Sequence, residues 1–170
     1  RPEHVKGLKF RIQDYDVLEA QFRALGANPQ KMAFAEVYQA LQTGVVDGTE
    51  NPPSNLYTQK MFEVQKHVSI TNHGYLGYAV ITNKKFWDEL PADVRGQLEK
   101  AMEEASTYAN KIAQEENDSS MAKVKASGKT DVYTPTAQER MALKKAMIKV
   151  HKEMESRIGK DTINAGYKAT

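Results

Sequence analysis

The stretch that follows Pro91 limits how this chain can fold more than any other part of the sequence. Apolar side chains recur there at helical spacing from about residue 93 to about residue 126. At a rise of 1.5 Å per residue, one helix over this range is roughly 50 Å long, which is longer than most helices in a compact domain. We therefore expect a single helix, continuous or kinked once within the polar stretch 114–120. Its apolar face is expected to be buried and consists of Val94, Leu98, Met102, Ala105, Tyr108, Ala109 and Ile112.

The first half of the chain alternates strand and helix patterns instead. Leu8, Phe10 and Ile12 alternate with polar residues, which predicts a strand over 7–13. The helices of this half are expected to end at Gly26 and Gly44, or to begin at the Pro52-Pro53 pair. This rhythm favours an α/β fold with a mostly parallel sheet. Further strands are predicted at 32–34, 45–49, 64–70 and, most clearly, at 75–82.

The last third of the chain reads as one short strand followed by helix. Residues 131–134 form a candidate strand, and Thr136 with Glu139 has the spacing of a capping box. A helix is therefore predicted to begin at Thr136. Its apolar face is expected to consist of Leu143, Met147, Val150, Met154 and Ile158.

Composition and motifs exclude several classes of function. The 170 residues carry a net charge of +2 with both signs interspersed, which predicts no nucleic-acid binding. No apolar run reaches about 18 residues, so no membrane-spanning helix is predicted. Cysteine is absent, and His4, His67, His73 and His151 lack the spacing of zinc ligands. Because nucleotide-binding and nucleophile motifs are also missing, the sequence predicts neither an enzyme nor a cofactor or metal site.

Two polar residues stand where a parallel sheet places ligands. Arg11 lies near the carboxyl end of the first predicted strand, and Asn51 follows the strand 45–49 directly before a helix that begins with proline. Ligands of open α/β sheets bind outside the carboxyl ends of the strands. A guanidinium matches a carboxylate in two hydrogen bonds, and an amide can both donate and accept. The N–H groups at the start of the next helix would add to a small-anion site. The alternative is that Arg11 is a surface residue and Asn51 a turn residue.

Four stretches together resemble one known family. They are KGLKFR at 6–11, MAFAEVYQALQTGVVDGTENP at 32–52, QKHVSITNHGYLGYAV at 65–80 and FWDELPADVRGQLEKA at 86–101. The chain is similar to the extracytoplasmic solute receptors of TRAP (tripartite ATP-independent periplasmic) transporters. The central stretch resembles the DctP-type subgroup, which binds four-carbon dicarboxylates.

The resemblance implies a fold and a set of ligand-binding residues. It implies a periplasmic-binding-protein-like fold of type II, in which two α/β lobes close over an organic acid and a long helix crosses behind both. Arg11 corresponds to the arginine that clamps the carboxylate, and Asn51 contacts the same region. Phe34 corresponds to an aromatic lid, while His73 and Tyr75 correspond to pocket-lining positions. For Phe34 the alternative is a core aromatic residue, and for His73 a histidine satisfied within its loop.

The function implied by the resemblance is capture of succinate, malate or fumarate in the periplasm and delivery to the membrane carrier subunits of a TRAP transporter. One alternative is a receptor for another organic acid, such as a 2-oxo acid, a sugar acid or sialic acid. Another is an extracellular module that senses its ligand. In each case the chain is a binding protein and not an enzyme.

The resemblance also implies that the chain corresponds to the C-terminal part of the family sequence. Residues 1–75 are then expected to form most of one ligand-binding lobe. Residues 76–170 are expected to contain a return strand, the long connecting helix and C-terminal helices that belong partly to the other lobe. If the partners of these segments are missing, apolar edges are exposed and self-association is expected.

Overall fold

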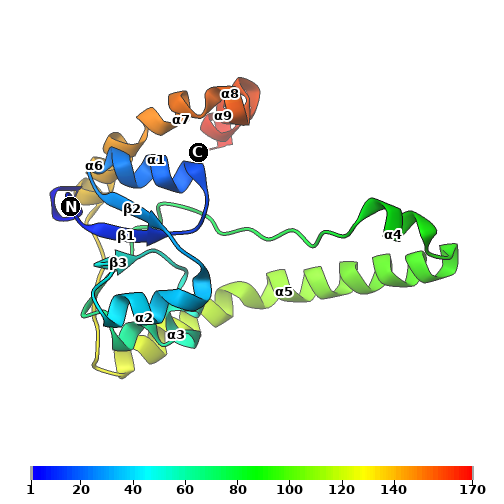
Figure 1. Cartoon of the computed structure of the whole chain (residues 1–170), viewed down its shortest axis with the longest axis horizontal. Coiled ribbons are helices and arrows are strands. Elements are labelled where there is room, and N and C mark those ends of the chain that lie inside the picture. The colour runs from blue at the N-terminus through cyan, green and yellow to red at the C-terminus, as the bar shows by residue number, and fades with distance from the viewer. Residues whose placement is uncertain (1, 170) are drawn as a thin grey trace.

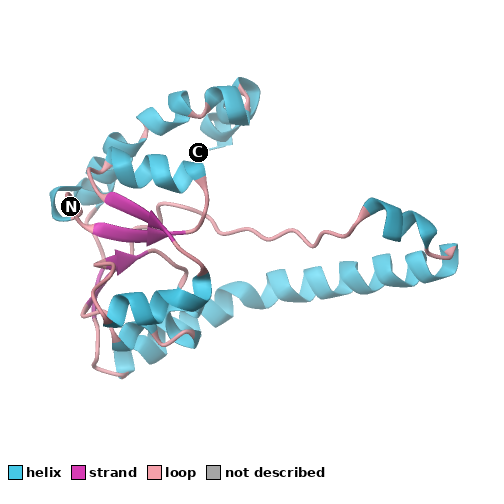
Figure 2. Ribbon diagram, viewed as in Figure 1, coloured by secondary structure: helices cyan, strands magenta, loops and turns pink. Residues whose placement is uncertain are grey.

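A small parallel sheet lies at the centre of one end of the molecule, and a long arm projects from that end (Figure 1). The structure is a computed structural model that describes residues 2–169. Helices cover both faces of the sheet (Figure 2), which makes this end an α/β lobe as predicted. The arm, which we define as residues 75–113, consists of an extended segment, a short helix and most of one long helix.

The central sheet has three parallel strands in the order β2-β1-β3. Arg11 in the middle strand is level with Gln30 on one side and with Thr49 on the other. All three strands therefore end at the same edge, as the site prediction requires. The strands are β1 (Lys9–Ile12), β2 (Asn28–Lys31) and β3 (Gly48–Thr49).

The predicted strand at 32–34 is wrong, because the strand at this place is β2 and it ends at Lys31. A 3-10 helix, η2 (Phe34–Glu36), follows instead. Among the described strands β2 is an edge, so it tolerates Pro29, which has no N–H to donate. Its polar sequence carries no alternation of apolar residues that would have revealed it.

Each face of the sheet has its own apolar core. Helix α1 (Asp16–Ala24) packs on one face, where Ile12, Phe22 and Ala27 are buried together. The other face is covered by α2 (Val37–Gln42), α3 (Pro53–Thr58), η3 (Met61–Glu63) and the last turns of the long helix. Buried there are Val37, Ala40, Leu41, Val46, Leu56, Met61, Phe62 and Val124.

A second, two-stranded parallel sheet joins the middle of the chain to its last third. It pairs β4 (His67–Ser69) with β5 (Asp131–Tyr133), so both predicted strands are present. Thr130, just before β5, is buried, and its hydroxyl lies 2.6 Å from the carbonyl oxygen of Phe62 and 2.9 Å from that of Gln65. This contact fixes the end of the long helix to the lobe.

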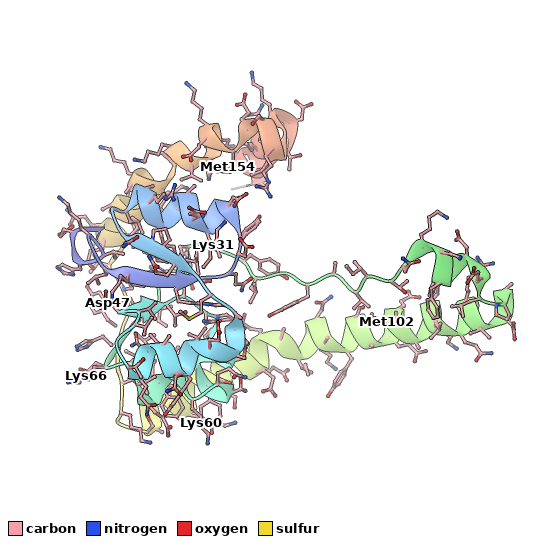
Figure 3. All side chains as sticks on the ribbon, in the orientation of Figure 1. Lys31, Asp47, Lys60, Lys66, Met102 and Met154 are labelled. Atoms are coloured by element: carbon pink, nitrogen blue, oxygen red, sulfur yellow. The ribbon has the colours of Figure 1, made fainter. Side chains whose placement is uncertain are left out.

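The long helix is α5 (Ala92–Ala126), a single helix of 35 residues with the predicted ends. Only its last part is buried, at Ser120 and Val124. The predicted burial of its first apolar face is wrong for the described chain, since Leu98 and Met102 are 40% and 38% exposed. Met102 lies far out on the arm, where no part of the lobe covers it (Figure 3).

The clearest predicted strand, 75–82, is absent from the structure. This segment is extended but belongs to no sheet, and it connects β4 to α4 (Lys84–Glu89) at the tip of the arm. The alternation of its residues suits a strand, but a strand also needs a neighbour for its N–H and C=O groups. The described residues provide none at this place.

The C-terminal helices lie over α1 and are separate, where the sequence predicted one helix (Figure 1). The capping box of Thr136 and Glu139 is confirmed, and Leu143 and Val150 are buried as expected. An ion pair between Arg157 and Asp16 ties this layer to α1. The helices are α6 (Ala137–Met147), α7 (Lys149–Glu153), α8 (Glu155–Ile158) and α9 (Lys160–Ala169), and a short 3-10 turn, η1 (Pro2–His4), opens the chain. No helix within residues 2–169 combines the length and apolarity needed to cross a bilayer.

Candidate ligand-binding site

Arg11 is a buried cation at the carboxyl end of the middle strand. Only 2% of the residue is exposed, although its side of β1 was predicted to be polar. The Nε and Nη2 atoms donate to the carbonyl oxygen of Met32, at 3.0 and 2.8 Å. The Nη1 atom is also buried and has no hydrogen-bond partner among the described residues. Two donors thus hold the guanidinium in place while a third remains unsatisfied, which is costly unless an acceptor meets it.

An open depression lies in front of Arg11. It has a volume of about 430 Å³ and is lined by Arg11, Gln13, Asp14, Lys31, Met32 and Ala33. Lys31 at its rim is not a free cation, because Asp14, Asp16 and Glu19 surround its ammonium group at 2.9 to 3.1 Å. These contacts raise the pKa of Lys31. Arg11 is therefore the cation of this depression that has a donor to spare.

Phe34 stands beside the guanidinium. It opens η2, and its ring centroid lies 5.7 Å from the Cζ atom of Arg11, within the range of a cation–π contact. The ring is partly exposed and is not a member of either core. Phe34 is therefore not a core aromatic residue of the described chain, and its role as a lid remains a prediction.

Glu50 and His73 form a second polar pair, in which Glu50 is near enough to interact with the charge of Arg11. His73 Nε2 is 3.8 Å from a carboxylate oxygen of Glu50, and His73 Nδ1 is 2.7 Å from the hydroxyl of Thr71. Burial raises the pKa of Glu50, and the charge of Arg11 opposes that shift. Burial lowers the pKa of His73. The same desolvation lowers the pKa of Arg11, and there the charge of Glu50 opposes it.

Asn51 lies next to this pair and is held by its neighbours. Its Nδ2 donates to the hydroxyl of Thr49 at 3.3 Å, and its Oδ1 accepts from Asn55 Nδ2 at 3.3 Å. Strands β1 and β3 are parallel, and Thr49 is level with Arg11. Asn51 follows Thr49 by two residues and therefore lies just beyond Arg11 at the same edge of the sheet. The structure thus places Arg11, Phe34, Asn51 and His73 at one edge of the lobe.

Tyr75 does not join them. It is 93% exposed and belongs to the arm. Within residues 2–169, Tyr75 does not line the depression in front of Arg11. Its pocket-lining role would require further protein packed against the arm, and it remains a prediction.

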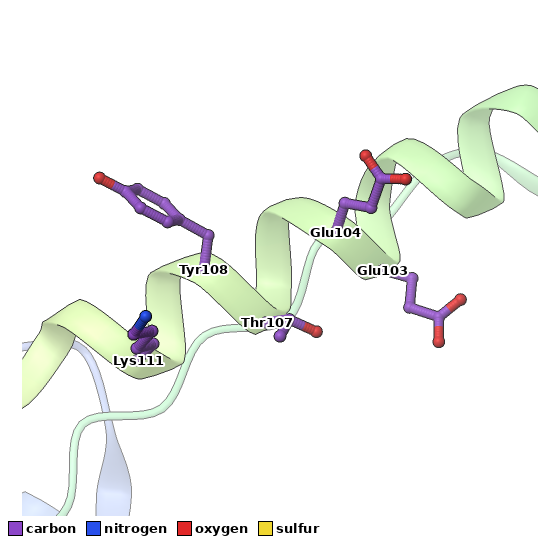
Figure 4. Close-up of a pocket in the computed structure, with 5 residues that line it drawn as sticks. All are labelled: Glu103, Glu104, Thr107, Tyr108 and Lys111. Carbon is purple, nitrogen blue, oxygen red and sulfur yellow. The ribbon is translucent and has the colours of Figure 1, made fainter.

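A second depression, of about 420 Å³, lies on the arm and is lined by Glu103, Glu104, Thr107, Tyr108 and Lys111. All five residues belong to one exposed helix, and in Figure 4 their side chains point in several directions from it. A ligand site needs groups that converge from different elements. This surface has none, so we do not treat it as a site. Within residues 2–169, no three His, Asp or Glu side chains gather as a metal site would require.

Glu50 was not among the residues predicted from the sequence, although it is the acidic neighbour of Asn51 and follows the same strand. A carboxylate directly after a buried strand end was the available signal. Its significance depends on Arg11 and His73, which are distant in the sequence and meet it only in the fold.

The fold is that of a periplasmic-binding-protein-like α/β lobe with a buried arginine at the ends of its strands. The chain belongs to the family of bacterial extracellular solute-binding proteins, family 7, whose model matches residues 1–157. This agrees with the resemblance drawn from the four sequence stretches.

Individual relatives agree with the family. The chain is 62% identical, over 99% of its length, to the C4-dicarboxylate-binding periplasmic protein DctP of Rhodobacter capsulatus. It superposes with a TM-score of 0.95, at 42% identity over 97% of its length, on a TRAP periplasmic solute-binding protein of Shewanella oneidensis with bound succinate. A Pseudomonas aeruginosa TRAP protein with bound L-malate matches 90% of the chain, with a TM-score of 0.87 and 41% identity. The chain spans 51% of the first of these proteins, 54% of the second and 53% of the third.

Proposed function

We propose that this chain is part of a receptor that captures a four-carbon dicarboxylate, such as succinate, malate or fumarate. The observation that carries the proposal is the guanidinium of Arg11, buried with one unsatisfied donor at the carboxyl ends of the strands. A planar, permanently charged donor group suits a carboxylate. The ligands named for the similar proteins, succinate and L-malate, both carry two carboxylates.

In this proposal Arg11 clamps one carboxylate and Asn51 contacts the same end of the ligand. Phe34 closes over the guanidinium and the bound group. The charge of Glu50 favours the charged guanidinium from the protein side, in a region that is largely removed from water, and His73 lies beside that carboxylate. Tyr75 would contact the ligand only when a second lobe covers the arm.

The second half of the ligand cleft is proposed to come from chain outside these 170 residues, because the similar proteins are about twice as long. Residues 1–75 form the larger part of one lobe. Residues 76–170 run out along the arm and back to the first lobe. The other lobe is proposed to pack on two parts of the arm, the exposed segment 75–82 and the first turns of α5. The apolar side chains along the arm support this division.

The receptor is proposed to work in the periplasm and to pass its ligand to the membrane subunits of a TRAP carrier. The names of the relatives, which describe periplasmic binding proteins, support the location. We propose a binding role without a catalytic step, which the solute-binding family and the names of the relatives support.

Calorimetric titration of the receptor, at the full length of its relatives, with a panel of acids tests the proposal. The panel contains succinate, L-malate, fumarate, pyruvate and galacturonate. We expect the three dicarboxylates to bind more tightly than pyruvate, which offers one carboxylate, and than galacturonate, which is larger. Tighter binding of galacturonate or pyruvate would contradict a dicarboxylate as the ligand and would indicate another organic acid. Turnover of any of the five would contradict a pure binding role.

A further inference from the structure

Helix α3 begins directly after Asn51 and has no capping side chain of its own. Its N-cap residue is Pro52, whose side chain accepts no hydrogen bond, and Pro53 has no N–H. The N–H of Ser54 instead donates to Oδ1 of Asn117, at 3.1 Å. Asn117 belongs to α5, so the long helix supplies the cap that α3 lacks. This finding also changes an expectation from the sequence, because the N–H of Ser54 is already used and is not free for a ligand.

A second hydrogen bond connects this cap to the candidate site. Asn55, the residue after Ser54, donates from Nδ2 to Oδ1 of Asn51 at 3.3 Å. The path from α5 to Asn51 therefore contains two hydrogen bonds and the single peptide unit between Ser54 and Asn55. A displacement of the first turn of α3 that moves Asn55 therefore acts on one of the hydrogen bonds that hold the Asn51 amide.

Asn117 also marks the place where α5 leaves the lobe. Ser120 and Val124, one and two turns further along the same face, are buried against the lobe. Towards the arm the helix is mostly exposed. Asparagine is a poor helix former, so its presence at this position is explained by its partner on α3 and not by the stability of α5 itself.

We propose that Asn117 is a positioning residue, which couples the direction of α5 to the orientation of Asn51. The inference rests on the proposed function, because it concerns how that binding site is held. In a two-lobed receptor the arm connects the lobes, so a change in the angle of α5 where it leaves the lobe moves Asn117. The cap on α3 carries this displacement to Asn51, and ligand affinity then depends on the position of the arm.

Substitution of Asn117 in the full-length receptor, with succinate titrated by calorimetry, tests the coupling. Asn117→Ala removes the acceptor and is expected to weaken succinate binding about threefold to tenfold. Asn117→Asp keeps an oxygen acceptor for Ser54 and is expected to bind more tightly than the alanine variant. Asp118→Ala serves as the matched control, because within residues 2–169 the side chain of Asp118 accepts a hydrogen bond from Gln114 of the same helix and none from α3. Its affinity is expected to equal that of the unmodified receptor.

A readout that needs no ligand separates this inference from the proposed function. Amide hydrogen exchange at Ser54 and the side-chain NH₂ resonances of Asn51 report the cap and the orientation directly. In Asn117→Ala we expect faster exchange at Ser54 and shifted Asn51 resonances, with both restored in Asn117→Asp. Unchanged exchange and resonances in Asn117→Ala would overturn the coupling, even if succinate binds well. If the unmodified receptor binds no succinate, the proposed function fails, and these two signals still decide whether Asn117 positions Asn51.

Discussion

His73 Nε2 lies 3.8 Å from a carboxylate oxygen of Glu50, and both side chains are largely removed from water. The pKa of Glu50 is raised and that of His73 is lowered, in each case mainly by burial. Each shift favours the neutral form of its group. The two groups therefore affect stability in opposite directions as pH changes, which makes them separable by mutation.

The pH dependence of folding is the first prediction. The lowered pKa of His73 means that the unfolded chain binds a proton more readily than the folded chain near and below the ordinary pKa of about 6.5. The free energy of unfolding should therefore decrease as pH falls through this range and increase as pH rises. His73→Gln should remove this part of the slope. Denaturant titrations at several pH values from 5 to 8 (roughly the range in which histidine titrates) measure it.

Thr71→Val is the control for the histidine. It removes the hydroxyl partner of His73 but keeps the imidazole in place. The sign of the slope should be retained in this variant. An identical slope in His73→Gln and in the unmodified protein would show that His73 is not buried as described.

Arg11→Lys is the second prediction and is not a conservative change. Lysine keeps the charge but loses the planar fork, so succinate affinity in the full-length receptor should fall tenfold or more. Because Arg11 also donates twice to Met32, the free energy of unfolding should fall by about 1–3 kcal/mol. Calorimetry and denaturant titration measure the two effects. Arg23→Lys, at an exposed surface pair, is the control and should change neither. Unchanged affinity in Arg11→Lys would contradict the clamp.

The two ends of α5 should respond differently to truncation of an apolar side chain. Val124 is fully buried in the lobe, so Val124→Ala should lower the free energy of unfolding by about 1–3 kcal/mol. Leu98 is 40% exposed on the arm, so in the 170-residue chain Leu98→Ala should change it by less than about 0.5 kcal/mol. In the full-length receptor, a second lobe over the arm should make Leu98→Ala markedly more costly. Equal effects of Leu98→Ala in both proteins would contradict the proposed division into lobes.

Self-association of the 170-residue chain is the fourth prediction. The segment 75–82 exposes Tyr75, Tyr78, Val80 and Ile81 together with an unpaired backbone, which is the pattern of an unprotected edge. Light scattering should show an apparent mass that rises with concentration, and Ile81→Lys should reduce it. Tyr15→Lys, at an exposed tyrosine of the lobe, is the control and should leave association unchanged. A monomer at all concentrations would show that this segment does not drive association.

The sequence predicted best those elements whose signals are local. The long helix has the predicted ends because its periodicity is long and Pro91 precedes it, and the capping box of Thr136 needs only three neighbours. It failed where the outcome depends on distant segments. β2 is a strand despite its polar sequence because β1 pairs with it, and 75–82 is not a strand because nothing described pairs with it.

The site shows the same division. Arg11 and Asn51 could be placed at the edge of the sheet from the order of strands and turns. The burial of Arg11 could not be predicted, because its side of β1 is polar in sequence and is covered by elements that follow it. Glu50 and Asn117 were missed, since their partners His73 and Ser54 are far away in the chain.

The pairing of β4 with β5 has a consequence for the engineering of this lobe. These neighbouring strands enclose the entire arm between them, so the arm is a single insertion into an otherwise continuous fold. The entropy of closing such a loop depends weakly on its length, and each halving lowers the cost by only about 0.6 kcal/mol. The arm can therefore be replaced by a short flexible linker with little thermodynamic effect on the lobe. The resulting minidomain would carry Arg11, Phe34 and Asn51 without the apolar surface that the arm exposes.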